Sequence, residues 1–193
     1  MKKIIQKNKL FWRHFVTRPS TLLERALRFQ GYHLAGLGHL LVISKNGVNR
    51  NFVESHEWNN EVKKAIMLAK TNKLEDKFKD FRKRFTTIRK FKSKTPESFF
   101  KIYAEVTEII IFSHFLEVEV DRNPKLHSYR KNVGYFHNTG RELIDQAYMN
   151  FFKVHKTQLE WYTPRELLSF LGNNEVLPAK TIIERKKYYV AYS

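Results

Sequence analysis

The stretch that decides the fold is residues 95–116, TPESFFKIYAEVTEIIIFSHFL. It opens with a helix start: Thr95 can cap free N–H groups, Pro96 fits the first turn, and the Glu97 carboxylate favours the positive end of the dipole. Apolar residues then recur at helical spacing and surround the helix almost completely toward Leu116. An all-round apolar helix is buried, so the sequence predicts a central helix on which the rest packs.

Two more long helices are predicted beside it. Over 60–88 the apolar residues recur at mostly three- and four-residue steps, which is typical of one long amphipathic helix. A third long helix is predicted over 140–161, after an Asn-Pro turn within 121–125 breaks the pattern. Short helices are predicted at 22–29, at 165–171 with a Thr163–Glu166 capping box and Gly172 as its end, and at 178–187.

Strand signals are confined to two places. Residues 39–53 hold two β-prone runs around Asn46-Gly47, a dipeptide that tolerates the positive φ angles of a tight turn, so a hairpin is predicted. Residues 188–192 read as a terminal strand. With only 7 Gly and 5 Pro, the fold class expected is mainly α: three long helices, short ones and a small β-hairpin. We expect a single domain over 1–193, with a helical core at about 60–187.

Charge and cysteine content limit the classes of function. Lys and Arg total 36 against 19 acidic residues, a formal charge of +17. Such an excess favours a polyanion or an acidic partner, and equally fits a solvated Lys-rich surface. The absence of cysteine excludes disulfides, a thiolate nucleophile and Cys-based zinc sites. Charges interrupt the N-terminal apolar residues, and the apolar run 109–116 is too short for a bilayer, so we expect a cytoplasmic protein without membrane contact.

The densest cluster of basic residues is 77–94, KFKDFRKRFTTIRKFKSK, in which cations alternate with phenylalanines. One interpretation is single-stranded nucleic-acid binding, through phosphate contacts and base stacking. The other is a core-facing Phe stripe with a solvated basic face, which the helical spacing of Phe78, Phe81 and Phe85 favours. The candidate nucleic-acid-binding residues are Lys77, Lys79, Arg82, Lys83, Arg84, Arg89, Lys90 and Lys92.

Catalytic and metal motifs are incomplete. Gly36-Leu-Gly38 is half of a dinucleotide fingerprint without its third glycine, and no P-loop or nucleophile elbow is present. His114 and Glu117 lie one turn apart, with Glu105 and Glu108 one to two turns earlier. Di-iron bundles instead use a Glu-x-x-His motif, with Glu before His, and repeat it on a second helix. Hydrogen-bonded polar residues on a buried helix explain them better. We therefore assign no catalytic residue, metal or cofactor, and lean against an enzyme.

The C-terminal third resembles a known family. It carries Gly140-Arg141-Glu142 on a helix, then WYTPRELLSFLG at 161–172 and IIERKKYYV at 182–190. This succession resembles the central region of phosphoenolpyruvate-utilising enzymes of the phosphoenolpyruvate synthase and pyruvate phosphate dikinase type. In that family a Thr/Ser-x-x-Glu-Leu helix and an Arg-Lys…Tyr segment precede the swivelling phosphohistidine domain. Thr17-Arg18-Pro19 is similar to an Arg-Pro segment in divergent members.

The departures from that family decide what the resemblance implies. Its catalysis needs an ATP-grasp domain, a histidine in a Thr-x-Gly-Gly-x-x-Ser-His setting and usually a phosphoenolpyruvate-binding barrel. No histidine here, His39 and His137 included, has that setting. The resemblance thus implies a non-catalytic helical module for interdomain or partner contacts, either a fragment of an enzyme or a partner of separately encoded catalytic domains. The alternative hypothesis is a basic RNA- or DNA-binding protein using 77–94.

Overall fold

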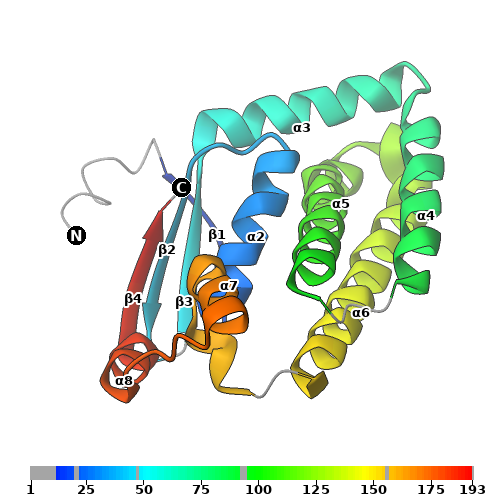
Figure 1. The fold of residues 1–193 in the computed structure, drawn as a ribbon. Coiled ribbons are helices and arrows are strands. Elements are labelled where there is room, and N and C mark those ends of the chain that lie inside the picture. The colour runs from blue at the N-terminus through cyan, green and yellow to red at the C-terminus, as the bar shows by residue number, and fades with distance from the viewer. Residues whose placement is uncertain (1–11, 20–21, 47, 92–94, 155–156, 193) are drawn as a thin grey trace.

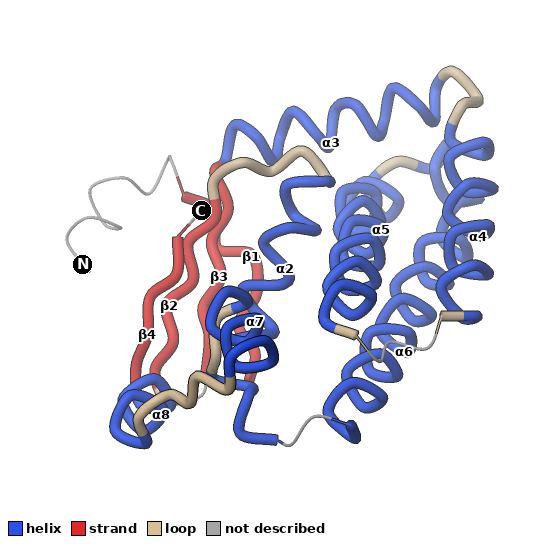
Figure 2. The backbone as a smooth tube through the Cα atoms, viewed as in Figure 1, coloured by secondary structure: helices blue, strands red, loops and turns tan. Residues whose placement is uncertain are grey.

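The computed structural model describes residues 12–19, 22–46, 48–91, 95–154 and 157–192, and within these ranges the chain is mainly helical (Figures 1 and 2). The helices are α2 (Leu22–Leu34), α3 (Ser55–Lys70), α4 (Leu74–Lys90), α5 (Pro96–Arg122), α6 (Arg130–Val154), α7 (Pro164–Asn173) and α8 (Ala179–Lys187). The strands are β1 (Trp12–Pro19), β2 (Leu40–Lys45), β3 (Val48–Glu54) and β4 (Tyr188–Tyr192). Two 3₁₀ helices, Pro124–Tyr129 and Thr157–Trp161, connect the longer elements.

The sheet is antiparallel, with strand order β1-β3-β2-β4. The predicted hairpin is confirmed as β2 and β3, and Asn46 adopts the positive φ of 51° that its turn requires. Gly47 lies outside the described residues. The terminal strand is confirmed as β4, which pairs with β2. The hairpin is therefore the centre of a larger sheet, whose outer strand β1 carried no alternating signal strong enough to be predicted.

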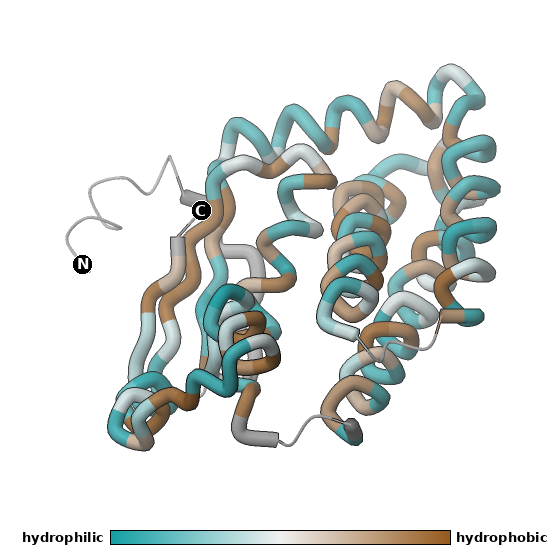
Figure 3. Tube along the Cα trace, viewed as in Figure 1, coloured by the Kyte–Doolittle hydropathy of each residue, from teal (hydrophilic) through white to brown (hydrophobic). Residues whose placement is uncertain are grey.

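The central helix is α5, as predicted. The Thr95 side chain caps it by accepting a hydrogen bond from the Ser98 N–H. The Ser98 hydroxyl in turn accepts a hydrogen bond from the Thr95 N–H. The helix packs against α6, α2 and α3, and Figure 3 shows brown apolar bands along it between teal polar ones. The Phe99 and Phe151 rings stack at 4.4 Å between centroids. A continuous cluster of buried apolar side chains joins the bundle to α2 and the sheet.

The prediction of one helix over 60–88 is wrong, because the chain turns between α3 and α4. Thr71 donates its hydroxyl to the Met67 and Leu68 carbonyls, and Asn72 adopts a positive φ of 58°. These two residues end α3, since the left-handed conformation cannot continue a helix. The apolar periodicity carries across the turn because both helices bury their stripes in the same core.

Three further helix bounds differ from prediction. The third long helix, predicted over 140–161, is α6, which begins ten residues earlier and ends at Val154. Helix α2 runs past Phe29 to Leu34, because Gly31 lies against Thr107 of α5 and lets the two helices approach. Helix α7 ends at Asn174 with a φ of 56°, so Asn174 and not Gly172 supplies the left-handed end. No helix in the described ranges has the length and apolarity of a membrane span.

Candidate interaction surfaces

The aromatic residues of the basic segment lie in the core. Phe78, Phe81 and Phe85 are at most 1% exposed, and all three rings contact Phe136 of α6 at centroid distances of 5.1–5.9 Å. The core-facing interpretation of this stripe is confirmed. These three rings could stack on nucleic-acid bases only by leaving the interior. Phe91, at the end of α4, differs from them because it is about half exposed.

The cations of α4 fall into two groups. The Arg84 guanidinium is half-buried and ion-paired with Glu108 at 2.6 Å; burial alone would lower its pKa, but the contacts with Glu108 and Glu105 raise it. Lys77 lies over the Phe81 ring at 4.9 Å, and Arg82 lies over the Phe136 ring and donates to Asn132. Arg82 is nevertheless exposed, as are Lys79, which pairs with Asp76 at 3.3 Å, Lys83, Arg89 and Lys90. Lys92 lies outside the described residues.

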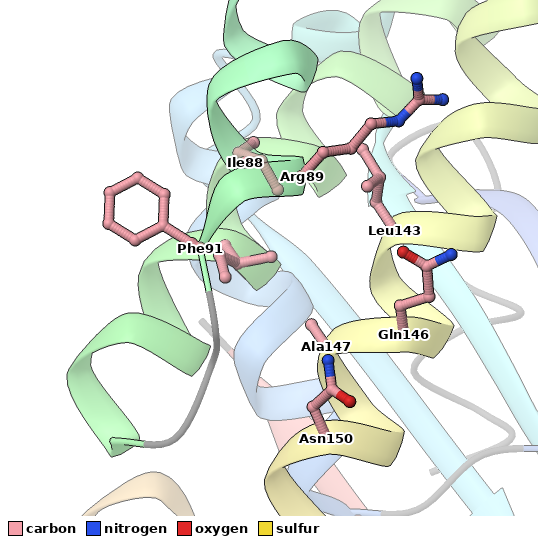
Figure 4. Close-up of a pocket in the computed structure, with 8 residues that line it drawn as sticks. Ile88, Arg89, Phe91, Leu143, Gln146, Ala147 and Asn150 are labelled. Carbon is pink, nitrogen blue, oxygen red and sulfur yellow. The ribbon is translucent and has the colours of Figure 1, made fainter.

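A small cavity lies between the end of α4 and α6, beside Ile88 and Arg89 (Figure 4). Its other walls include Leu143, Gln146 and Asn150 of α6. The volume is about 50 Å³, which is room for one or two water molecules. A cofactor-sized ligand needs a pocket of several hundred cubic ångströms. This cavity therefore offers no place for one.

His114 of α5 and His137 of α6 lie side by side, and His114 is hydrogen-bonded within its own helix. His114 Nδ1 lies 2.7 Å from Glu117 Oε2, and this hydrogen bond lowers the pKa of the Glu117 carboxyl. The His137 ring meets His114 edge-on at 4.6 Å, and burial, helped by the neighbouring cations, lowers the pKa of His137. Within the described ranges, no group of three or more His, Cys, Asp or Glu side chains could hold a metal ion.

The glycine pair before β2 has its backbone donors occupied. Glu57 of α3 accepts hydrogen bonds from the Gly38 and His39 N–H groups, both at 2.9 Å. Burial would raise the pKa of Glu57, but these bonds and the His39 ring at 2.6 Å hold it below its usual value. A phosphate would need the same N–H groups. The carboxylate already fills the position that a nucleotide would take.

The sheet has one covered and one outward face. Burial alternates along β2 and along β3 as far as Val53, and the inward positions pack toward α2 and the Thr157–Trp161 turn. The outward positions are half-buried or exposed. Described outward residues are Leu41, Ile43, Lys45, Val48, Arg50, Phe52, Tyr188 and Val190. They are cross-strand neighbours: Ile43, for example, pairs with Arg50 on one side and Val190 on the other.

An ion pair fixes the elements that carry β4. Arg185 of α8 donates hydrogen bonds from Nη1 and Nη2 to the two carboxylate oxygens of Glu166 of α7, at 2.7 and 2.8 Å. Its Nη1 also donates to the Trp161 carbonyl at 2.8 Å. Glu166 also completes the predicted capping box with Thr163, which is confirmed. The Arg185 hydrogen bonds lower the pKa of Glu166 to about 2. The contact thus joins the segments 161–172 and 182–190.

Comparison of the chain with protein-family models, with curated proteins and with solved structures finds no match. The outward sheet face was not predicted as a site. Its signal was present in the sequence, because Leu41 and Ile43 are apolar at positions that alternate with the equally apolar Leu40 and Val42. Strands that are buried on both faces have apolar residues at consecutive positions. The apolar run of β2 therefore indicates that its outward face can also be buried.

Proposed function

We propose that this chain is a non-catalytic helical module that makes interdomain or partner contacts, related to the middle region of phosphoenolpyruvate synthase-like proteins. The observation that supports the proposal is the outward sheet face. Val190 is 39% exposed, Tyr188 48% and Val48 45%, around the half-buried Ile43 and Phe52. Contiguous apolar side chains left facing water are typical of a contact surface. Partners of the implied type are separately encoded ATP-grasp and phosphohistidine domains.

The non-catalytic part is tested with the isolated chain. We expect no ATP hydrolysis and no phosphoprotein after incubation with labelled ATP or phosphoenolpyruvate. A phosphohistidine on any residue would overturn the proposal. His39→Asn, His114→Asn and His137→Asn variants would identify the modified residue, since His39 and His114 are hydrogen-bonded to carboxylates and the His137 ring touches that of His114.

The contact part is tested by mixing the chain with isolated ATP-grasp and phosphohistidine domains of a phosphoenolpyruvate synthase. We expect a complex by light scattering after gel filtration, weakened by Ile43→Glu on the outward sheet face. Met149→Glu is the matched control, since Met149 is a 71% exposed apolar residue of α6, away from the sheet. Equal weakening by both variants would contradict a role of the sheet face.

A second candidate function, phosphate-backbone binding to RNA or DNA, is favoured by one observation. Lys79, Lys83 and Lys90 lie on the exposed side of α4 at helical spacing. Such binding is electrostatic and falls steeply with salt. We expect Lys83→Glu combined with Lys90→Glu to abolish gel shifts of single-stranded RNA at low salt, with Lys180→Glu as control. No shift with the unaltered chain would end this hypothesis.

A further inference from the structure

We propose that β4 receives a partner by strand addition: an extended segment of another protein, alternating acidic and apolar residues, pairs with the outer edge of β4. The inference rests on the proposed contact function and names the edge and the chemistry of the partner. Exposed sheet edges present rows of backbone donors and acceptors that another strand can pair with.

The two edges of this sheet differ in how they resist such pairing. Strand β1 contains Arg13 and Arg18, ends at Pro19, and has a register shift between His14 and Val16. Charge, proline and a bulge are the devices that natural sheets use to block edge pairing. Strand β4, YYVAY, contains no charged residue and no proline. Among the strands that the structure describes, the β1 edge thus contains these devices and the β4 edge does not, which makes β4 the receptive one.

The backbone of β4 is oriented for pairing. The Asn46 N–H donates to the Lys187 carbonyl at 2.8 Å, which makes this the first hydrogen-bonded pair beside β4. Hydrogen-bonded positions alternate along an antiparallel ladder, so Tyr189 and Ala191 direct their backbone groups to β2. Val190, between them, directs its N–H and C=O to the outer edge. Its side chain lies on the outward face, 39% exposed.

Charge identifies the chemistry of the partner. The exposed Lys186 and Lys187 precede β4, and Lys45 stands opposite Tyr188 in the neighbouring strand. The exposed outward positions of β2, β3 and β4 include Lys45 and Arg50, and the acid in this register, Glu54 at the end of β3, is buried and caps α3 by accepting from the His56 and Glu57 N–H groups. Carboxylates near the start of β4 would be attracted, and the attraction speeds association as well.

Two other occupants fit this edge less well. A second copy of the chain would bring another net charge of +17 and another set of Lys186 and Lys187 to the contact. Single-stranded nucleic acid would be attracted by the same cations, but it has no peptide N–H and C=O groups with which to continue the ladder at the edge of β4. An acidic, β-forming protein segment satisfies the charge, the apolar face and the edge together.

The edge is also held in place before binding. The Glu166–Arg185 contact anchors α8, and β4 follows α8 without an intervening loop. A preorganised edge loses less conformational freedom on binding than a mobile one.

The test uses the full chain and a fluorescein-labelled ten-residue peptide of alternating Glu and Val, read by fluorescence anisotropy. We expect saturable binding that weakens at least tenfold in the Lys186→Glu/Lys187→Glu variant and disappears with Val190→Pro. The matched control Met149→Lys should bind unchanged. Because proline could unfold β4, Val190→Lys is measured as well, and amide exchange of Val190 should slow when the peptide is bound to the unaltered chain.

Several results would overturn the inference. These are equal binding of a Lys-Val peptide, unchanged binding by the Lys186→Glu/Lys187→Glu variant, tighter binding of a twelve-residue polyuridine RNA at the same edge, or self-association that Val190→Lys abolishes. The proposed function fails separately. A phosphohistidine would end it even if the peptide binds β4, and a domain complex insensitive to Val190→Lys would end only the strand-addition inference.

Discussion

The interiors on the two sides of this molecule differ in chemistry. Between α5 and α6 the buried groups are mostly rings and aliphatic chains, with Phe99 against Phe151 at 4.4 Å. Beneath the sheet, the buried residues include two arginines and three neutral polar side chains. They are Arg25, Arg28, Ser44, Asn49 and Asn51, all at most 7% exposed. One side is held by packing, whereas the other depends on polar groups that must be oriented.

Burial shifts the pKa values of ionisable groups on the sheet side. Burial lowers the pKa of Arg25 and raises the pKa of Tyr189 to about 12. Arg28 remains charged because Tyr103 and the Glu24 carboxylate, at 3.0 Å, outweigh its burial and raise its pKa. Buried charges contribute less net stability than apolar packing of the same volume. We therefore expect the sheet side to open locally more often than the bundle.

The largest predicted effect removes the aromatic contact at the centre of the bundle. Phe99→Ala should lower the free energy of unfolding by about 3–5 kcal/mol, since Phe99 is fully buried and stacked on Phe151. Urea denaturation measures the change. Met149→Ala, a truncation of a 71% exposed side chain, is the control. A loss below that of the control would contradict a packing-dominated bundle.

A smaller effect is predicted where the two sides meet. A Cβ at Gly31 of α2 would lie 2.4 Å from the Thr107 Cβ and 2.7 Å from the Ala104 carbonyl of α5. The Ala104 carbonyl belongs to the backbone of α5 and cannot move away from the added methyl group as a flexible side chain would. Gly31→Ala should therefore lower the free energy of unfolding by about 1–3 kcal/mol. Gly134→Ala in α6, which meets nothing within 4 Å, should instead stabilise by about 0.5–1 kcal/mol through helix propensity. Thermal melting of both variants should give shifts of opposite sign.

The comparison also explains what the sequence could predict. Buried helices follow from apolar periodicity, so the Thr95 start of α5 and the core position of Phe81 were predictable. The break at Asn72 was not, because two helices that bury their stripes in one core leave a continuous pattern. The start of α6 was missed for a related reason: its first turns contain mixed polar and aromatic residues, among which only Val133 and Phe136 are buried.

The candidate surface was harder to predict than the fold. The cations of α4 were visible as a run, but which of them pair internally, as Arg84 does with Glu108, depends on residues 24 positions away. The receptive edge depends on strand order, which places β1 and β4 outside the hairpin. Strand order is a long-range property without a local signal. The Thr163 capping box was predictable, whereas its contact with Arg185 was not.

The smallest predicted effect lies on the sheet side and depends on pH. The Glu166 carboxyl has a folded pKa of about 2, below its ordinary 4.5, because Arg185 donates to it. A depressed pKa stabilises the fold above pH 4.5, and this contribution is lost as pH falls from about 4.5 to about 2.

Glu166→Gln should therefore be less stable than the unaltered chain by about 1 kcal/mol at pH 7, since the ion pair is partly solvated and screened. Denaturation at several pH values measures the difference, which should shrink to near zero at pH 2. Glu160→Gln, the same change on the neighbouring turn, is the control for the removal of one negative charge. A Glu166→Gln difference that stays constant down to pH 2 would mean that the side chain contributes through its hydrogen bonds to Thr163 and not through its charge. The α7–α8 contact that positions β4 would then be a capping interaction, insensitive to acid.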